Sequence, residues 1–364
     1  MKTSILKNKL VGFEFPIYLW RLLQFISVSI VLIGIVGLFI QPETTLFFIW
    51  FVLIPIIPLL LFVSPGLWRN LCPIAVINQL PRMAGAGENI RVPPWFVTHS
   101  GIISLCLFVL IVSCRKILFN DNAVALACLL IVILLIAMFM GIRYKGKSGW
   151  CTSICPMLPV ERLYGQGAFI DFAHSHCQPC VACTKSCSDL QPKSQRSALP
   201  THNQRDKKPI PYFACFASIF PGFIFAYYLA PNPIMSDWLE IGRMYSYFVV
   251  FCSISACFFF LAKLLLQVSL RRMTIFYGAA AFNIYYWFNA SLISSHFPLA
   301  LQYEADIAIR ISAGFLSLLW LLRAYRKTVY ISSNSVPIYN NTRSVSMQIL
   351  PSEKSSKRLK PIGS

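Results

Sequence analysis

The sequence predicts an all-α integral membrane protein, on the evidence of its composition, its apolar runs and its positive charge. Apolar residues make up 57% of the 364 residues and charged residues 12%, about half of the roughly 25% that is usual in soluble domains. A soluble surface needs more charge than this. The net charge of +19 is explained by basic loops held on one side of a bilayer. The predicted surroundings are therefore membrane lipid, with no nucleic-acid partner.

Eight apolar runs are long enough to form transmembrane helices, since a bilayer core of about 30 Å takes about 20 helical residues. The third run begins after Pro93 and Pro94, where proline suits a first helical turn, and contains His99. No small-residue cleavage site follows the first run, so no cleavable signal peptide is predicted. The predicted spans are 22–40, 46–63, 96–114, 123–142, 210–230, 245–267, 274–295 and 307–324.

The distribution of Lys and Arg orients these spans. With the N-terminus in the cytoplasm, most of the 32 basic residues fall in cytoplasmic segments, and the outer side holds Arg115, Lys116, Arg243 and Arg310. This asymmetry predicts that both termini are cytoplasmic. The predicted cytoplasmic segments are 1–21, 64–95, 143–209, 268–273 and 325–364.

The chain divides into four predicted regions. Two membrane regions of four helices each are separated by a cytoplasmic loop, and a tail rich in Ser, Asn, Lys and Arg is expected to be disordered. The regions are 1–142, with a first Cys-Pro motif in the large loop 64–95, then the loop 143–209, the membrane region 210–324 and the tail 325–364.

The 13 cysteines sort by depth. Those inside predicted spans are expected to act as small apolar residues: Cys106, Cys114, Cys128, Cys215, Cys252 and Cys257. The other seven fall in the cytoplasmic loops, where thiols stay reduced: Cys72, Cys151, Cys155, Cys177, Cys180, Cys183 and Cys187.

The most specific pattern is the run Cys177-Gln-Pro-Cys180-Val-Ala-Cys183-Thr-Lys-Ser-Cys187. Its C-x2-C-x2-C-x3-C spacing is that of a run that binds a [4Fe–4S] cluster, because two intervening residues let successive thiolates reach different corners of one cube. Zinc modules usually separate two cysteine pairs by a dozen or more residues. The sequence therefore predicts one [4Fe–4S] cluster on these four cysteines, with its iron as the metal.

A Cys-Pro motif follows each of the first two helix pairs. Trp68 leads to Cys72-Pro73, and Trp150-Cys151 leads to Cys155-Pro156, with an offset of 83 residues between Cys72 and Cys155. If residues 151–155 are helical, the two thiols share a face, and the proline biases Cys155 out of the helix. The three thiols are candidates for a second cluster or for redox chemistry of their own. A second cube would need a further ligand, and His174 and His176 are the nearest candidates.

These motifs resemble the membrane-bound polyferredoxins of the NapH and NosR type over about residues 20–190. The resemblance implies a multi-pass protein of the bacterial cytoplasmic membrane that passes electrons to a reductase or oxidase. Related accessory proteins of cytochrome oxidase assembly share the pattern. The chain departs from it in having Trp68 at the first motif's leading cysteine, Ser188 after the fourth cluster cysteine, and a single ferredoxin run.

The sequence thus predicts an electron-transfer component rather than a stand-alone catalyst. Its donor would be a quinol or a soluble ferredoxin or flavodoxin, the latter docked by basic residues of the loop: Lys185, Lys193, Arg196, Arg205, Lys207 and Lys208. The aromatic segment from Tyr277 to Phe288 is a candidate quinone lining. Haem is not expected, since only His99 lies in a span and axial ligation takes paired histidines. The alternative function is a maturation or regulatory factor whose cluster senses redox state and whose C-x3-C thiols handle a metal ion.

Overall fold

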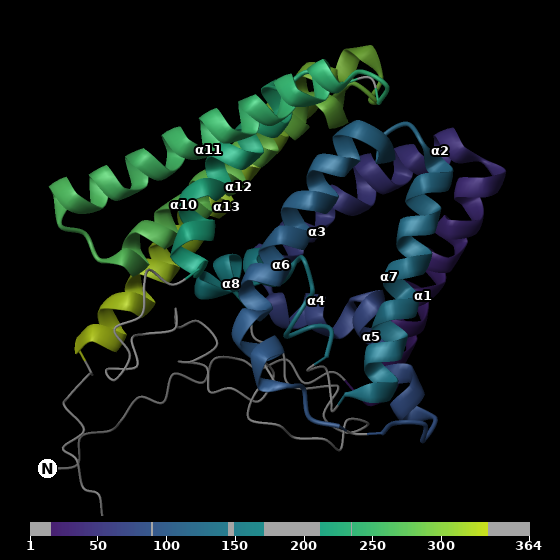
Figure 1. The fold of residues 1–364 in the computed structure, drawn as a ribbon. Helices are drawn as coiled ribbons and strands as arrows, with labels where there is room; N and C mark the ends of the chain where they lie inside the picture. Colours follow the sequence, from purple (N-terminus) through teal and green to yellow (C-terminus); the bar gives the residue numbers. More distant parts are fainter. Residues whose placement is uncertain (1–15, 89, 145–148, 171–211, 234, 334–364) are drawn as a thin grey trace, which may run out of the picture.

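A computed structural model describes residues 16–88, 90–144, 149–170, 212–233 and 235–333 (Figure 1). Within these ranges the chain is helical, and its β-structure is limited to an isolated bridge between Ile90 and Tyr144. The prediction of an all-α protein is confirmed. The four cysteines of the ferredoxin run lie outside the described residues.

The N-terminal half contains four long helical stretches, of which two include a change of helix type, and two short helices, α4 and α5. The second stretch runs from α2 through η1 to α3 without a break, and the third runs from α6 into η2. The elements are α1 (Ile17–Ile40), α2 (Pro42–Phe47), η1 (Phe48–Leu53), α3 (Ile54–Val63), α4 (Pro65–Leu71), α5 (Pro73–Met83), α6 (Pro94–Cys114), η2 (Arg115–Phe119) and α7 (Ala123–Arg143).

The C-terminal half is a group of four long helices, drawn in green to yellow in Figure 1, and a short helix α8 precedes it. Along the group, α10 packs on α11 and α12, and α12 packs on α13. The elements are α8 (Leu158–Tyr164), η3 (Gly165–Gly167), α10 (Tyr212–Leu229), α11 (Trp238–Leu266), α12 (Leu270–Ser294) and α13 (Leu299–Ser333).

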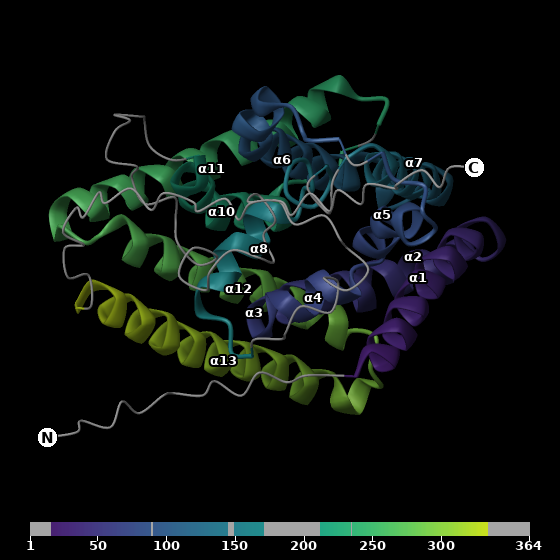
Figure 2. The ribbon, with the colours of Figure 1, turned by 90° about the horizontal axis from the view of Figure 1, so that it is seen from below.

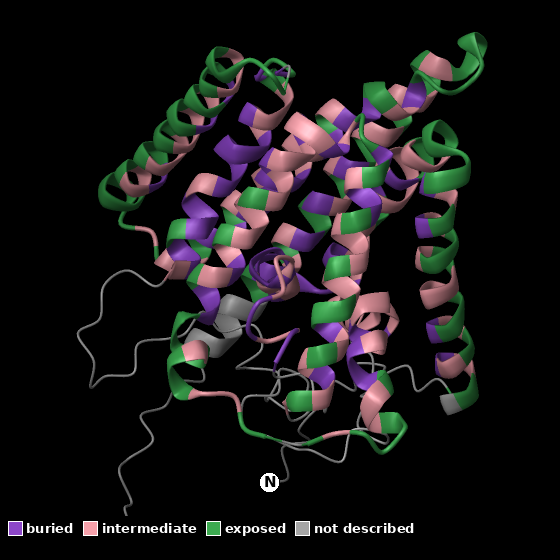
Figure 3. Ribbon diagram, turned by 45° about the vertical axis from the view of Figure 1, so that its right-hand side comes forward, coloured by how far each residue is buried: buried purple, intermediate pink, exposed green. Residues whose placement is uncertain are grey.

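Seven helical stretches of the described chain are long and apolar enough to cross a membrane, which establishes a multi-pass membrane protein. They match seven of the eight predicted spans: Tyr18–Ile40, Pro42–Val63, Pro94–Phe119, Ala123–Arg143, Tyr212–Leu229, Trp238–Leu266 and Leu299–Arg326. Many large apolar residues of these stretches are exposed, as a lipid-facing surface requires, and Figure 3 marks the exposed positions in green along the outer helices.

The remaining predicted span, 274–295, coincides with α12, a helix of 25 residues that is less apolar than the other seven. Arg271 and Arg272 begin it, and Asn283 and Asn289 lie further along. Its inner face is buried against the neighbouring helices, where Asn283 Nδ2 donates to Ser317 Oγ of α13 at 2.7 Å. Packing inside the protein, rather than contact with lipid, explains how α12 accommodates these polar residues.

Two regions expected to be loop or tail are helical. The segment 64–95 contains α4 and α5, and α13 continues to Ser333, so residues 325–333 belong to a helix rather than to the tail. Helix α5 packs lengthwise on α7, where Asn78 Nδ2 donates to the Ala137 carbonyl at 2.7 Å. The search for transmembrane runs does not detect α5, because this helix is amphipathic and too short to span a membrane.

The segment 149–170 is buried where the two halves meet, and Figure 2 shows α8 near the middle of the bundle. All the residues of α8 except Arg162 are buried. The Trp320 indole N–H donates to the Tyr164 carbonyl at 3.0 Å, and Phe169 N–H donates to the Val63 carbonyl at 2.9 Å. Helices α3 and α13, which come from different halves, are therefore joined through this segment.

Aromatic rings fill the same junction. Phe62 of α3 stacks on Phe282 of α12 with ring centroids 4.0 Å apart and on Trp320 of α13 at 4.6 Å. Tyr164 of α8 meets Phe62 edge-on at 5.4 Å. All four side chains are almost fully buried, and rings of this size contribute both apolar burial and favourable ring geometry.

The contact between α5 and α7 requires a glycine. A Cβ atom at Gly141 would lie 1.9 Å from the Asn78 carbonyl oxygen, a backbone atom. We expect Gly141→Ala to force the two helices apart and to lower the free energy of unfolding by about 1–3 kcal/mol. Thermal unfolding of the purified protein in detergent measures this loss.

The matched control is Gly34→Ala in α1, because a Cβ atom there meets nothing within 4 Å. It should leave the unfolding temperature unchanged or slightly raised, since alanine favours helix over glycine. Equal unfolding temperatures for the two variants would show that α5 does not pack on α7 in this way.

Candidate functional site

The site is built around the three thiols of the two Cys-Pro motifs, because these are the predicted site residues that the structure describes. Cys72, Cys151 and Cys155 are all partly buried. Cys177, Cys180, Cys183 and Cys187, with His174 and His176, fall outside the described residues, and their predicted role stays a prediction.

Cys72 occupies the bend between α4 and α5. Its amide donates to the Trp68 carbonyl at 2.7 Å and closes α4, while its carbonyl accepts from the Val76 amide at 3.0 Å and opens α5. Pro73 stands in the first turn of α5, where its missing N–H costs nothing. The proline also keeps Cys72 out of helical geometry, with φ −55° and ψ 118°. The thiol is therefore held at a fixed corner rather than on a helix face.

Cys151 and Cys155 lie in a compact set of turns, not in the helix that the sequence analysis considered for residues 151–155. The Trp150 carbonyl accepts from Ser153, Ile154 and Cys155 at 3.1–3.2 Å. Cys155 itself is outside any helix and α8 begins at Leu158, so the predicted effect of Pro156 is confirmed.

A second helix anchors this turn. The Ser104 hydroxyl of α6 donates to the Cys155 carbonyl, and the Ser104 side chain is fully buried. Trp150 and Ile154 form an apolar cluster with Ala137 of α7, against which both thiol-bearing residues pack. The position of Cys155 is thus fixed by contacts with α6 and α7, two membrane helices that precede it in sequence.

The three thiols share one electrostatic environment. Burial raises the pKa of the Cys155 thiol well above its usual range, and the neighbouring Cys151 and Cys72 thiols raise it further. Each ionised thiolate would disfavour ionisation of the others. Three thiolates here require a compensating cation, whereas three protonated thiols do not. Cys72 and Cys151 are thus near enough to Cys155 to act on its ionisation, while a shared site of the three thiols stays a prediction.

An ion pair joins the two motifs beside these thiols. Arg69, three residues before Cys72, pairs with Glu161 of α8, six residues after Cys155. Their side chains are only 18% and 9% exposed, and Glu161 also acts on the Cys155 thiol. Sequence analysis did not single out this pair. The available signal was Glu161 itself, an acidic residue within the apolar stretch Leu158-Pro-Val-Glu-Arg-Leu-Tyr164.

The chain leaves and re-enters the described structure at the same end of the bundle as the three thiols. Ile170 N–H donates to the Val63 carbonyl at 3.1 Å, next to α4. The Tyr212 hydroxyl accepts a hydrogen bond from Arg162 of α8. Both ends of the segment that contains the ferredoxin run are therefore attached beside α8.

The described thiols do not form a ready-made metal site. Within the described part of the chain, no three His, Cys, Asp or Glu side chains are grouped closely enough to hold a metal ion. The thiol chemistry still suits soft metals and iron–sulfur clusters. The arrangement offers three sulfur ligands in one neighbourhood, whose use as a metal site needs either a small rearrangement or a further ligand.

The chain was compared with protein-family models, curated proteins and solved structures, and none of them matches it. Functional conclusions therefore rest on its own residues.

The Arg69–Glu161 pair gives a stability prediction. Removing either partner with Arg69→Met or Glu161→Met takes the opposite charge of this pair away from a mostly buried group, and we expect a loss of about 3–5 kcal/mol. The double variant should lose less than either single variant, because it removes both charges of the pair. Thermal unfolding of the unchanged protein, the two single variants and the double variant measures these losses.

The exposed pair Arg143–Glu88, with both side chains 47% exposed, is the matched control. Glu88→Gln should change stability by no more than about 1 kcal/mol. Additive losses in the Arg69 and Glu161 cycle would show that the two residues do not interact.

Proposed function

We propose that this protein is a membrane-anchored [4Fe–4S] electron-transfer protein. It relays single electrons between a quinol or a soluble cytoplasmic donor and a partner reductase or oxidase. The sequence basis is the run from Cys177 to Cys187, whose spacing is that of a cluster-binding segment. The structural observation that carries the proposal is that the two Cys-Pro motifs meet in space, joined by the Arg69–Glu161 ion pair, with Cys72 and Cys151 near enough to Cys155 to act on its thiol.

The described residues on either side of the ferredoxin run support this proposal. Ile170, bonded to the Val63 carbonyl, and Tyr212, bonded to Arg162 of α8, both lie at the junction that carries α8, and six residues separate Ile170 from Cys177 in sequence. The cluster, when bound, supplies the one-electron redox chemistry. The chain supplies the thiolate ligands, their position against the membrane and the polarity of their surroundings.

The three gathered thiols favour a second redox site within the same function. In two-cluster ferredoxins the fourth cysteine of a run binds the neighbouring cluster, and a distant Cys-Pro completes the first. Cys72 and Cys155 each precede a proline, as that arrangement requires. Two cubes need eight ligands and the loops contain seven cysteines, so His174 or His176 would supply the eighth.

The alternative function, metal handling during maturation of another protein, rests on the same three thiols. Cys151 and Cys155 lie on one turn, and paired thiols of this kind bind soft ions such as Cu(I). Turnover of the cluster by a quinol or a reductase favours electron transfer, whereas stoichiometric metal binding at Cys151 and Cys155 favours maturation.

We further propose that α12 also crosses the membrane, which makes eight spans and puts both termini in the cytoplasm. Its 25 residues extend over about 37 Å at 1.5 Å per residue, enough for a core of about 30 Å. Its polar side chains have partners in neighbouring helices, as when Asn289 donates to the Tyr228 hydroxyl of α10. Internal hydrogen bonds of this kind are what a polar residue in a span needs.

Cysteine substitution tests the cluster. Cys180→Ser and Cys183→Ser should abolish the visible absorbance and the paramagnetic signal of the reduced protein, because a hydroxyl is a harder and less acidic ligand than a thiol. Iron analysis of protein purified without oxygen should find about four irons per chain with one cluster and about eight with two.

Cys128→Ala and Cys252→Ala are the controls, since these cysteines lie in α7 and α11, away from the site. Both should keep iron and spectrum. Loss of iron in Cys155→Ser identifies a second cluster, whereas loss of electron transfer with full iron content assigns the Cys-Pro thiols their own redox role. Full iron and spectrum in Cys180→Ser would contradict the cluster proposal.

Reporter fusions test the topology. Fusions after Asp189 and Ser364 should report the cytoplasm, and fusions after Asp121 and Asp237 the outer face, because basic residues are retained on the cytoplasmic side. A reporter on the outer face after Ser364, with the other three as expected, would mean that α12 does not cross.

A further inference from the structure

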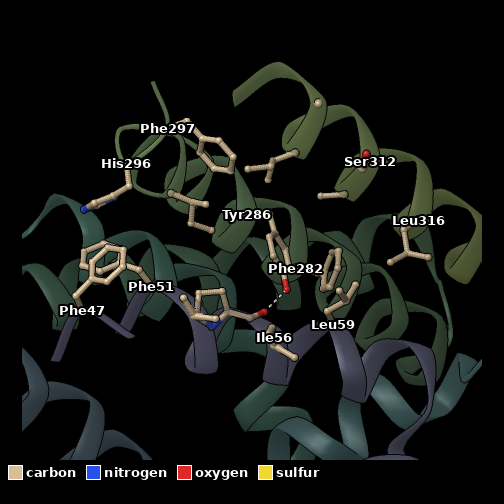
Figure 4. Close-up of a pocket in the computed structure, with 16 residues that line it drawn as sticks. Phe47, Phe51, Ile56, Leu59, Phe282, Tyr286, His296, Phe297, Ser312 and Leu316 are labelled. Carbon is tan, nitrogen blue, oxygen red and sulfur yellow. Dashed lines mark hydrogen bonds between the residues drawn. The ribbon is translucent and has the colours of Figure 1, made fainter. Parts of the chain in front are cut away.

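A cavity of about 600 Å³ lies between the α2–η1–α3 stretch and the pair α12–α13 (Figure 4). It is remote in sequence from the thiol site and shares no residue with it. Two of the candidate spans, Pro42–Val63 and Leu299–Arg326, supply most of its walls. Its volume falls in the range of about 300–1,000 Å³ that is usual for small-molecule sites.

The walls of this cavity are almost entirely apolar. Phe51, Ile56 and Leu59 line one side, and Phe282 and Leu316 line the other. Water does not stably fill an apolar cavity, and leaving it empty costs contact energy that grows with its volume. Inside a bilayer the abundant molecule that fits both the walls and the volume is a hydrocarbon chain.

The cavity has few polar groups, and two of them are engaged within the protein. The Tyr286 hydroxyl donates to the Pro55 carbonyl at 2.5 Å, across the cavity floor shown in Figure 4. At the rim, His296 Nδ1 lies 2.9 Å from the Leu292 carbonyl, and its ring packs on Phe47 and Phe51 with centroids 4.6 and 4.9 Å apart. A quinone ring needs donors for its two carbonyl oxygens, and the lining offers few, namely the Ser312 hydroxyl and Nε2 of His296 at the rim. A saturated chain needs none.

We propose that this cavity binds one acyl chain of a membrane phospholipid. The acyl chain fills the space between the α2–η1–α3 stretch and the α12–α13 pair and completes the packing of the two halves there. The proposal does not depend on the iron–sulfur function, because none of the lining residues takes part in the thiol site.

The test uses the full-length protein in lipid nanodiscs that contain a phospholipid with a photoreactive diazirine on its acyl chain. After illumination, mass spectrometry should find the label on the peptide that holds Phe51, Ile56 and Leu59. Ser312→Phe places a ring in the cavity from α13 and should reduce this labelling about tenfold, equivalent to a loss of about 1.4 kcal/mol in binding. Ala308→Phe, one turn earlier and also on the lining, is a second filling variant.

The matched control is Ile311→Phe, because Ile311 lies on the same helix, is 65% exposed and does not line the cavity. It should label like the unchanged protein. Undiminished labelling in both filling variants would overturn the site. Displacement of the probe by an isoprenoid quinone, but not by added phospholipid, would overturn the assignment to an acyl chain.

Discussion

The arrangement of this protein depends on the backbone of one buried segment, residues 149–170. Irregular chain between membrane helices must have its N–H and C=O groups satisfied, because neither lipid nor the apolar core offers partners. Here Trp320 donates to the Tyr164 carbonyl, Arg323 to the Ala168 carbonyl and Ser104 to the Cys155 carbonyl. The partners come from α13 and α6, so helices of both halves are fixed around the same short stretch of chain.

That constraint also decides where the thiols lie. Cys155 stands at the entrance of the buried segment, and the ion pair from Glu161 to Arg69 attaches the segment to the first Cys-Pro motif. A buried ion pair contributes little net stability against apolar replacements, but it allows only one relative placement of its two partners. The repeated motifs, 83 residues apart in sequence, therefore meet in space, with Cys72 near enough to Cys155 to act on its thiol.

The C-terminal half supports this arrangement without contributing a thiol to it. Helix α12 packs its buried face against α10 and α13, and Phe282 joins the aromatic stack at the junction. At the other end of the bundle, Lys116 is 5% exposed and donates to the Tyr227 and Ala230 carbonyls at the end of α10. A cation at the carboxyl end of a helix is favourable, which accounts for a buried lysine at this position.

The sequence by itself determined the helical class, the membrane setting and seven of the spans, because about 20 apolar residues in a row permit few other structures. It also marked the chemistry, since cysteine spacing restricts which metal groups a chain can bind. Only the tertiary structure decided that 64–95 folds into α4 and α5, that Cys151 and Cys155 lie on turns, and that Arg69 meets Glu161. The ion pair and the packing of α5 on α7 arise from contacts between residues distant in sequence, such as Asn78 with Ala137, and no local pattern encodes such a pairing.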